Sequence, residues 1–397
     1  MSWNLSPRSK ACAAAASVAA AFMLMLAQPS GATPRVPLQD NEIVETLPAV
    51  GGWSREERRL RRELVARPRD AATAIEAARR YLELARAQGD ARYAGYAMGA
   101  LQAWLPVSAR TPNDILVMHA TVAQFLHDFD GAEATLEMAL AQQPGNAQGW
   151  LTLATILRVR GRYAESDTAC RSLVRLRQNL YATACLAENA GLRGEHQAAR
   201  DALQGLLQSP AVQDRRQGAT RQWLLTTVAQ IEELAGRPAA ADAAYRKALA
   251  AERSGYDVLA YSDFLLAQKR PREASALLKN EPRSDAVLLR LAMADKTGAT
   301  ASRDREELLA RFDAAALRPG TVALHAREQA LFALDVQGDA ARALALSRLN
   351  VQLQREPIDL LVMARAAAAA NDDAARREVK ALMQQIGLRD ARVDALP

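Results

Sequence analysis

The side chains of this sequence that could do chemistry are few and scattered. His127, Asp128 and Asp130 lie close together, and these residue types could supply ligands to a metal ion. They fall in an expected turn before Ala132, where short polar side chains cap helices, and a metal site needs a fuller ligand set. The sequence contains no G-x-x-x-x-G-K-[ST], H-E-x-x-H or G-x-S-x-G motif. We therefore expect no catalytic residue, no metal and no cofactor.

The elements that must position any site are predicted to be helices. Of the 397 residues, 50% are apolar and 24% are charged, which supplies a large core and excludes general intrinsic disorder. Aromatic residues make up only 5%, and alanine occurs in runs such as residues 366–370, which favours helix over sheet. The length suits two or three compact domains or one elongated repeat array.

The N-terminus has the layout of a secretory signal. Two basic residues precede an uncharged stretch at residues 11–27, and small residues at 30–32 fit a cleavage site. We expect cleavage near Ala32, which makes residues 1–32 a signal peptide and residues 33–52 a flexible leader in the bacterial periplasm. The alternative is an uncleaved anchor in the inner membrane, although a span needs about 20 predominantly apolar residues. We expect no stable membrane insertion after cleavage.

An arginine-rich stretch follows the leader. Its five arginines, between positions 55 and 62, alternate with glutamates at spacings that let opposite charges meet on a helix. Ser54 and Glu57 form a capping box, which predicts an N-terminal capping helix over residues 53–69. Removal of the signal lowers the formal charge from +6 to +4, with 49 basic against 45 acidic residues. This balance lacks the basic patch of a nucleic-acid-binding protein.

Beyond residue 70 the chain alternates two amphipathic helical stretches of about a dozen residues, divided by short turns. One equivalent position recurs at separations of 34, 33, 42 and 33 residues: Phe129, Tyr163, His196, Pro238 and Pro271. Small or apolar residues follow three and seven positions later, which places them on one stripe of the second helix of each pair. The step of 42 marks an insertion around Gln208 to Gln217.

This pattern resembles the tetratricopeptide repeat (TPR), a 34-residue helix–turn–helix unit. In the best unit, Gln148 to Asn179, the family's positions hold Trp150, Leu153, Ala154, Leu157, Gly161, Tyr163, Ser166, Cys170 and Leu173. The resemblance covers residues 70–388 in about seven to nine units, and the pattern is irregular after residue 270. It implies an all-α, right-handed superhelical solenoid of antiparallel helix pairs with a concave groove, followed by a C-terminal tail at residues 389–397.

In this family the exposed face of each unit's first helix lines the groove. Carried over position by position, the resemblance implies these partner-binding residues: Gln124, Thr155, Arg158, Glu188, Trp223, Gln230, Glu233 and Asp263. Their charges are mixed in sign, so the groove does not suit a polyanion. The alternative for each residue is ordinary solvated helix surface, and Trp223 is the most costly of them to expose.

The resemblance also places two cysteines on neighbouring helices. Cys170 falls on the second helix of one unit and Cys185 on the first helix of the next, and such helices pack directly. In an oxidising compartment a disulfide would close this loop of roughly 15 residues and stabilise the fold by about 3 kcal/mol. The alternative is a pair of small buried thiols that fill helix contacts.

The sequence predicts a non-enzymatic, exported scaffold or adaptor that binds a protein or peptide partner in the cell envelope. Two alternatives stay open. The chain could be a structural component of an envelope secretion or export assembly. It could also be an enzyme or metal-handling protein whose site is assembled from several units and leaves no sequence motif.

Overall fold

The computed structural model describes residues 55–295, 299–317 and 321–396, so the expected signal peptide and leader lie outside the described residues. The chain divides into Met1–Arg55 and a compact unit, Glu56–Pro397, and the helical fold is that of the second. Within the described ranges all regular elements are helical and no strand occurs. None of the described helices combines the length and apolarity needed to cross a lipid bilayer.

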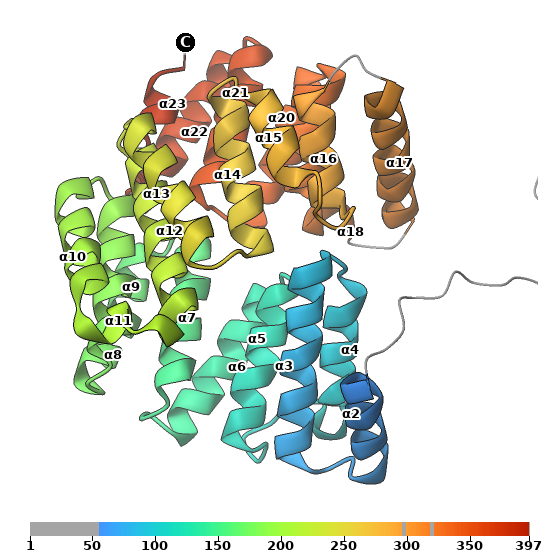
Figure 1. Cartoon of the computed structure of the whole chain (residues 1–397), viewed down its shortest axis with the longest axis vertical. Coiled ribbons are helices and arrows are strands. Elements are labelled where there is room, and N and C mark those ends of the chain that lie inside the picture. The colour runs from blue at the N-terminus through green and yellow to red at the C-terminus, as the bar shows by residue number, and fades with distance from the viewer. Residues whose placement is uncertain (1–54, 296–298, 318–320, 397) are drawn as a thin grey trace, which may run out of the picture. The chain divides into compact units, whose positions relative to one another are not determined.

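Antiparallel helix pairs follow one another along the described part of the chain (Figure 1). There are nine such pairs among these residues: α3/α4 (Ala71–Gln88, Arg92–Ala100), α5/α6 (Asn113–Phe125, Phe129–Gln142), α7/α8 (Ala147–Val159, Tyr163–Arg175), α9/α10 (Asn179–Leu192, His196–Gln208), α12/α13 (Gly218–Leu234, Pro238–Ala251), α14/α15 (Gly255–Ala267, Pro271–Leu278), α16/α17 (Asp285–Ala294, Ala299–Ala316), α19/α20 (Ala326–Leu331, Ala340–Leu353) and α21/α22 (Pro357–Ala369, Asp373–Ile386). The predicted all-α repeat fold is confirmed.

Shorter elements complete the described chain. These are α2 (Arg55–Ala66), η1 (Gln102–Trp104), α11 (Pro210–Gln213), η2 (Arg215–Gln217), α18 (Thr321–Leu324), η3 (Phe332–Gln337) and α23 (Ala391–Asp394). The predicted insertion folds into α11 and η2, and its Val212 is fully buried in the core beneath them. The buried side chain of Val212 anchors this segment to the core, whereas the sequence predicted only an inserted loop.

The same turn conformation identifies equivalent pairs where the sequence pattern is irregular. Two positions before the second helix, a residue with a positive φ reverses the chain in seven of the pairs: His127, Gly161, Gly194, Gly236, Lys269, Gly338 and Asn371. Glycine adopts this left-handed conformation without a steric penalty, and asparagine tolerates it better than most residues. The last two of these turns lie beyond residue 270, so the helix pairs continue after the sequence motif has faded.

The core lies between the two helices of each pair and between neighbouring pairs. The predicted stripe of small residues is 0–2% exposed, at Ala132, Ser166, Ala199, Ala241 and Ala274. Small side chains let the second helix approach the first closely, and their burial stabilises a pair that is too small to be stable alone. Pro238 and Pro271 are exposed. Each occupies the first turn of its helix, where a backbone N–H would have no partner within the helix, so the lack of that N–H in proline costs no hydrogen bond.

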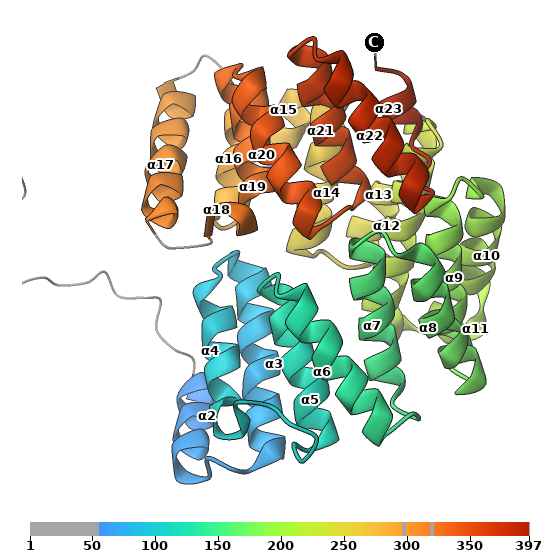
Figure 2. The ribbon, with the colours of Figure 1, turned by 180° about the vertical axis from the view of Figure 1, so that it is seen from behind.

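The C-terminal pairs pack against the turn ends of the middle pairs, so the array closes on itself (Figure 2). The backbone N–H of Arg355 donates to the carbonyl of Val159 at 2.7 Å, and that of Arg389 donates to Leu192 at 2.9 Å. One buried cluster joins both regions, with members Tyr163, Leu192, Leu234, Met363, Met383, Leu388 and Val393. Closure removes this apolar surface from water, which stabilises the contact.

The end of the chain takes part in this closure. Residues 389–397 are predicted to form a tail, and within them α23 packs on α12 and α21. Val393 is 6% exposed, and Leu388, directly before this segment, is 1% exposed, so buried apolar side chains anchor the end of the chain. Gly161, Gly194 and Gly236, at three successive turns, lie beside the segment from Ile386 to Ala391. Their lack of a side chain allows the close approach.

Candidate functional site

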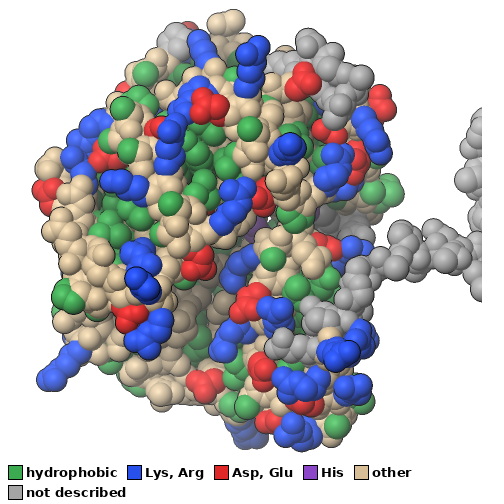
Figure 3. Space-filling model, in the orientation of Figure 1, with side chains coloured by type: hydrophobic (Ala, Val, Ile, Leu, Met, Phe, Trp, Pro, Cys, Tyr) green, Lys and Arg blue, Asp and Glu red, His purple; other side chains and the backbone are tan. Residues whose placement is uncertain are grey.

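Closure of the array leaves a partly open cavity of about 560 Å³. The first helices of successive pairs line it from α5 through α21, and α23 lines it at the C-terminal end. All eight residues that the repeat pattern assigns to a groove line this cavity: Gln124, Thr155, Arg158, Glu188, Trp223, Gln230, Glu233 and Asp263. Figure 3 shows this face of the unit hollowed near its middle, with acidic and basic side chains around the hollow. The structure therefore brings the eight residues together around one cavity.

The arginines that line the cavity are all paired with carboxylates from other helices. Arg158 on α7 lies 3.0 Å from Glu188 on α9. Arg290 on α16 lies 2.5 Å from Asp263 on α14. Because each pair joins two successive first helices, it fixes the spacing of those helices along the cavity wall.

The C-terminal part of the wall holds a larger charge network. Arg327 on α19 donates to Glu356 at 2.5 Å and to Asp359 at 2.6 Å. Asp359 is 1% exposed, and its burial raises its pKa to about 6 although Arg327 acts to lower it. Asn350 also donates to this carboxylate at 2.6 Å. Glu356 and Asp359 form a capping box at the start of α21, so the network also positions that helix.

A second network joins the two regions that closure brings together. Arg392 on α23 donates to Glu233 on α12 at 2.8 Å, across 159 positions of sequence, and also to Asp390 at 2.7 Å. The hydroxyl of Tyr245 donates to the other oxygen of Glu233 at 2.5 Å. Burial raises the pKa of Glu233, while Arg392 acts to lower it.

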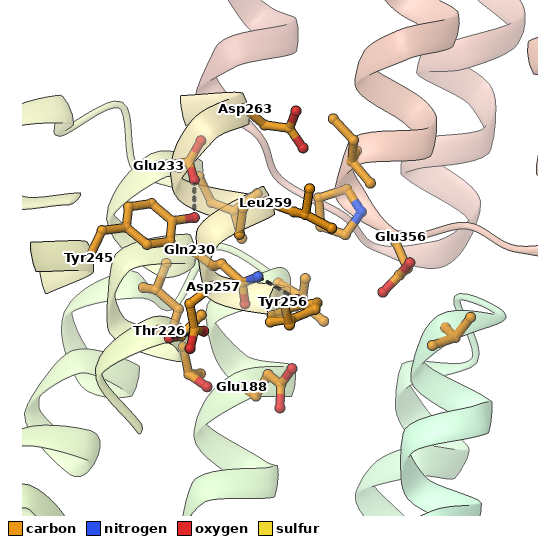
Figure 4. A pocket seen from close by; sticks show the side chains of 18 of the residues that line it. Glu188, Thr226, Gln230, Glu233, Tyr245, Tyr256, Asp257, Leu259, Asp263 and Glu356 are labelled. Carbon is orange, nitrogen blue, oxygen red and sulfur yellow. Dashed lines mark hydrogen bonds between the residues drawn. The ribbon is translucent and has the colours of Figure 1, made fainter. Parts of the chain in front are cut away.

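Tyr256, near the start of α14, projects into the cavity between Glu188 and Glu356 (Figure 4). It is 62% exposed, and its hydroxyl oxygen accepts a hydrogen bond of 2.8 Å from Gln230 Nε2. Burial raises the pKa of Glu188. An aromatic ring with an open face therefore stands among carboxylates.

Other polar contacts hold Asp257 beside Tyr256. The Asp257 carboxylate is fully buried and accepts hydrogen bonds from Thr226 at 2.7 Å, from Ser254 at 2.6 Å and from Gln222. These donors are neutral, and two of them lie on α12. The bonds therefore tie the start of α14 to α12 and fix the direction in which Tyr256 points.

Trp223 lies at the cavity wall and is half-buried. Its ring stacks with that of Tyr181 on α9, with 6.2 Å between centroids and 29° between planes. Tyr181 is 42% exposed, so the pair presents aromatic surface from two successive first helices. Amphipathic aromatic side chains of this kind dominate the binding energy of many protein interfaces.

A smaller cavity of about 420 Å³ adjoins the first and shares Gln124 and Glu328 with it. His127 and His325 line it from the N-terminal and the C-terminal parts of the array. Burial lowers the pKa of His127, and its Nδ1 is buried without a hydrogen-bond partner. Arg86 lies 5.7 Å from the ring centroid of Phe125 in the same wall.

The residues considered as a metal site have structural contacts. Asp128 caps α6 by accepting a hydrogen bond of 3.0 Å from the Gly131 amide, and Asp130 pairs with Arg160. His127 supplies the left-handed residue of the turn, with φ of 63°. Among the residues that the structure describes, no group of three or more His, Cys, Asp or Glu side chains is arranged to hold a metal ion.

Cys170 and Cys185 form a disulfide that joins α8 to α9, and both side chains are buried. The two helices belong to neighbouring pairs, as the repeat pattern implied. Asn189 lies beside the bond and donates to Ser166 and Asp167, each at 2.9 Å. The disulfide and these hydrogen bonds fasten two units together.

Sequence reasoning missed the cavity residues that the repeat motif does not mark. These include Tyr256, Asp257, Arg290, Arg327, Glu328, Glu356 and Arg392. Equivalence with a repeat motif identifies concave positions only where the motif is clear. Residues from the C-terminal units reach the cavity because the array closes, and no local pattern signals that closure. Tyr256 carried one local signal, because a large aromatic side chain is costly to expose.

The helix pairs and their recurring turns define a TPR-like, all-α superhelical repeat protein. Neither a family model nor a curated protein matches the sequence. Among solved structures, the chain is similar to a tetratricopeptide repeat protein from Parabacteroides merdae, with 16% sequence identity, coverage of 64% of this chain and 89% of that chain, and a TM-score of 0.44. It is similar to PilW, described as a type IV pilus biogenesis factor (17% identity, 55% and 97% coverage, TM-score 0.39). It is also similar to the APC/C hetero-tetramer Cut9–Hcn1 (13% identity, 81% and 64% coverage, TM-score 0.49). At these TM-scores, the similarities say nothing of what this chain binds.

Proposed function

We propose that this protein is an exported, non-catalytic scaffold that binds a short segment of a protein partner in its central cavity. One observation carries the proposal: all eight residues of the predicted partner-binding face line the same cavity. A pocket with apolar walls and a few convergent polar groups is the usual form of a binding site. The layout of residues 1–32 supports export to the bacterial periplasm, where the partner is expected to reside.

The size of the cavity limits what can enter. One turn of helix with its side chains is a cylinder about 10 Å across and 5.4 Å long, which fills roughly 420 Å³. A cavity of about 560 Å³ therefore has room for at least one such turn. The partner is expected to insert a few residues and to contact Trp223 in the cavity wall.

The use of charge in the cavity supports binding rather than catalysis. The arginines join successive first helices or close the array, through pairs such as Arg158–Glu188 and Arg392–Glu233. These ion pairs hold the cavity wall in one shape, and their polar atoms can form hydrogen bonds with a ligand. Such paired arginines suit a preformed recognition surface, which binds without the loss of free energy that ordering a loose surface entails.

The test uses a partner recovered by cross-linking from an envelope extract. We expect Trp223→Ala to weaken its binding by tenfold or more, because a central aromatic side chain commonly contributes about 2 kcal/mol or more to an interface. Trp104→Ala, in η1 outside the cavity, is the matched control and should leave binding unchanged. Equal binding by both variants would contradict a role for the cavity. Cell fractionation and mass spectrometry of the mature N-terminus test export, which requires a chain that begins near Thr33.

A further inference from the structure

The charged side chains of the central cavity are held by one another. Each of the four lining arginines has a carboxylate oxygen within 3.0 Å: Arg158 pairs with Glu188, Arg290 with Asp263, Arg327 with Glu356 and Arg392 with Glu233. The carboxylate of Asp257 accepts its hydrogen bonds from neutral side chains. A charged group that entered here would lose water and find these counter-ions engaged, which is unfavourable.

Glu328 is the exception among these groups. It forms no ion pair with any residue that the structure describes, and it is shared with the smaller cavity, which Arg86 also lines. Removal of this one carboxylate is therefore a direct check on whether an unpaired charge selects the ligand.

The ring of Tyr256 is an aromatic surface of the cavity that lacks a partner. It projects into the cavity from the first turn of α14 and is 62% exposed (Figure 4). The other aromatic side chains of the wall are stacked, Trp223 with Tyr181 and Tyr245 with Tyr261. Within the described part of the chain no ring stacks on Tyr256, and Gln230 holds its hydroxyl. The ring is therefore fixed in position with one face free.

Aliphatic side chains from three helices extend this apolar surface. Leu259 follows Tyr256 by three positions on α14, so both lie on one side of that helix, and both line the cavity. Leu331 on α19 and Ile358 on α21 line it as well. The surface that the ion pairs leave available to a ligand is thus an aromatic face with aliphatic surroundings.

We propose that the cavity recognises an aromatic side chain of the partner segment, whose ring packs against the free face of Tyr256. This inference rests on the proposed function, since it names the chemistry of the segment that enters. Two aromatic rings in contact bind more tightly than their buried area alone implies, by about two- to tenfold. A lysine, arginine, aspartate or glutamate at the same place would stay without a counter-ion, so the cavity discriminates against it.

The experiment selects peptides that bind in the cavity. Random dodecapeptides displayed on phage are selected on the purified protein, and those that the Trp223→Ala variant binds equally well are discarded. The remaining sequences are synthesised with both ends capped, and calorimetry measures their affinities. We expect one phenylalanine, tyrosine or tryptophan in each peptide to be essential. Its replacement by alanine or lysine should weaken binding by about tenfold or more, and its replacement by leucine by about two- to tenfold.

Variants of the protein locate the contact. Tyr256→Ala should weaken binding of these peptides by about tenfold or more, whereas Tyr256→Phe keeps the ring and should bind them as the natural protein does. Glu328→Gln should leave their affinity unchanged, and so should a rise in salt concentration, because no charge on the peptide is recognised. Tyr96→Ala is the aromatic control, since Tyr96 is 49% exposed on α4 and lines neither cavity.

The outcomes separate the two proposals. Trp223-dependent peptides would overturn this inference, and leave the proposed function standing, if their aromatic residue is dispensable, if Tyr256→Ala binds them equally well, or if Glu328→Gln or salt weakens them. Failure to recover any Trp223-dependent peptide would overturn both. Far-UV circular dichroism of each variant checks folding. If Tyr256→Ala does not fold, Tyr256→Leu replaces it, since it keeps apolar bulk and should remove only the preference for an aromatic residue over leucine.

Discussion

The closure of the array predicts an energetic coupling between two residues that are far apart in sequence. Arg392 Nη1 lies 2.8 Å from Glu233 Oε2, and the two side chains are 25% and 11% exposed. Two unit charges about 4 Å apart attract by about 4 kcal/mol at an effective dielectric constant of 20, and desolvation and partial exposure reduce this value. We therefore expect a coupling free energy of about 1.5–3 kcal/mol, the range of hydrogen bonds to charged groups.

A double-mutant cycle measures that coupling. The variants are Glu233→Gln, Arg392→Gln and their combination, studied by urea denaturation followed by circular dichroism. Glutamine keeps an oxygen that can accept the Tyr245 hydrogen bond, so the first variant removes charge without leaving that hydroxyl unpaired. The bond from Arg392 to Asp390 is lost equally in both arms that alter Arg392, and it cancels from the cycle.

The control cycle pairs Glu233→Gln with Arg376→Gln. Arg376 lies on α22 and donates to Asp373 and Ala368, within its own helix pair. Effects of residues that do not interact add to within about 0.3–0.5 kcal/mol, so this cycle should show no coupling. Additivity of the Glu233 and Arg392 substitutions, with equal denaturation slopes in all four proteins, would refute the closed arrangement.

Three further predictions concern the disulfide, the turns and a buried carboxylate. Reduction of the Cys170–Cys185 bond should raise the thiol count of the unfolded protein by two and lower the free energy of unfolding by about 3 kcal/mol; an unchanged count would exclude the bond. Gly161→Ala should destabilise more than Gly338→Ala by about 1 kcal/mol or more in the same denaturation assay. Both glycines have a positive φ, but a Cβ would meet a neighbouring side chain at 2.9 Å only at the first, so equal costs would argue against the C-terminal contact. Burial raises the folded pKa of Asp359 from 3.8 to about 6, so this group's contribution to stability is lost as the pH rises through 6. Relative to Asp359→Asn, the natural protein should lose about 1–3 kcal/mol between pH 4 and pH 7, and a constant difference would contradict the raised pKa.

The sequence predicted the repeating units because their determinants are local. Small residues such as Ser166 and Ala199 sit at the contact between the two helices of a pair, and helical periodicity places them there. Glycines such as Gly161 mark the turns through their own backbone preference. Equivalence between units then placed the concave positions, and all eight of them face one cavity. None of these steps depends on how distant units pack.

The closure could not be predicted in the same way, because its contacts join residues more than 150 positions apart. Arg392 has no repeat signature, and only the accumulated curvature of many pairs brings it to Glu233. Small rotations at each interface between pairs add up along an array, and their total cannot be predicted from the repeat pattern of the sequence. The missed residues Arg327 and Glu356 entered the cavity for that reason. Tyr256 was missed although its unit is regular, because it stands near the helix start rather than on the equivalent concave turn.

Closure also changes what the charges in this array can do. In an open repeat array, Glu188 and Glu233 would lie on a water-filled concave face, where ion pairs contribute little and discriminate weakly between ligands. Once the C-terminal pairs cover that face, the same carboxylates are partly desolvated, and their interactions with a ligand strengthen. The pKa of each is raised by burial, which is the sign expected of a carboxylate that has lost water and gained too little positive charge. The path of the chain as a whole therefore determines the electrostatics of the cavity, and Arg392 of the closing segment is itself one of the lining residues.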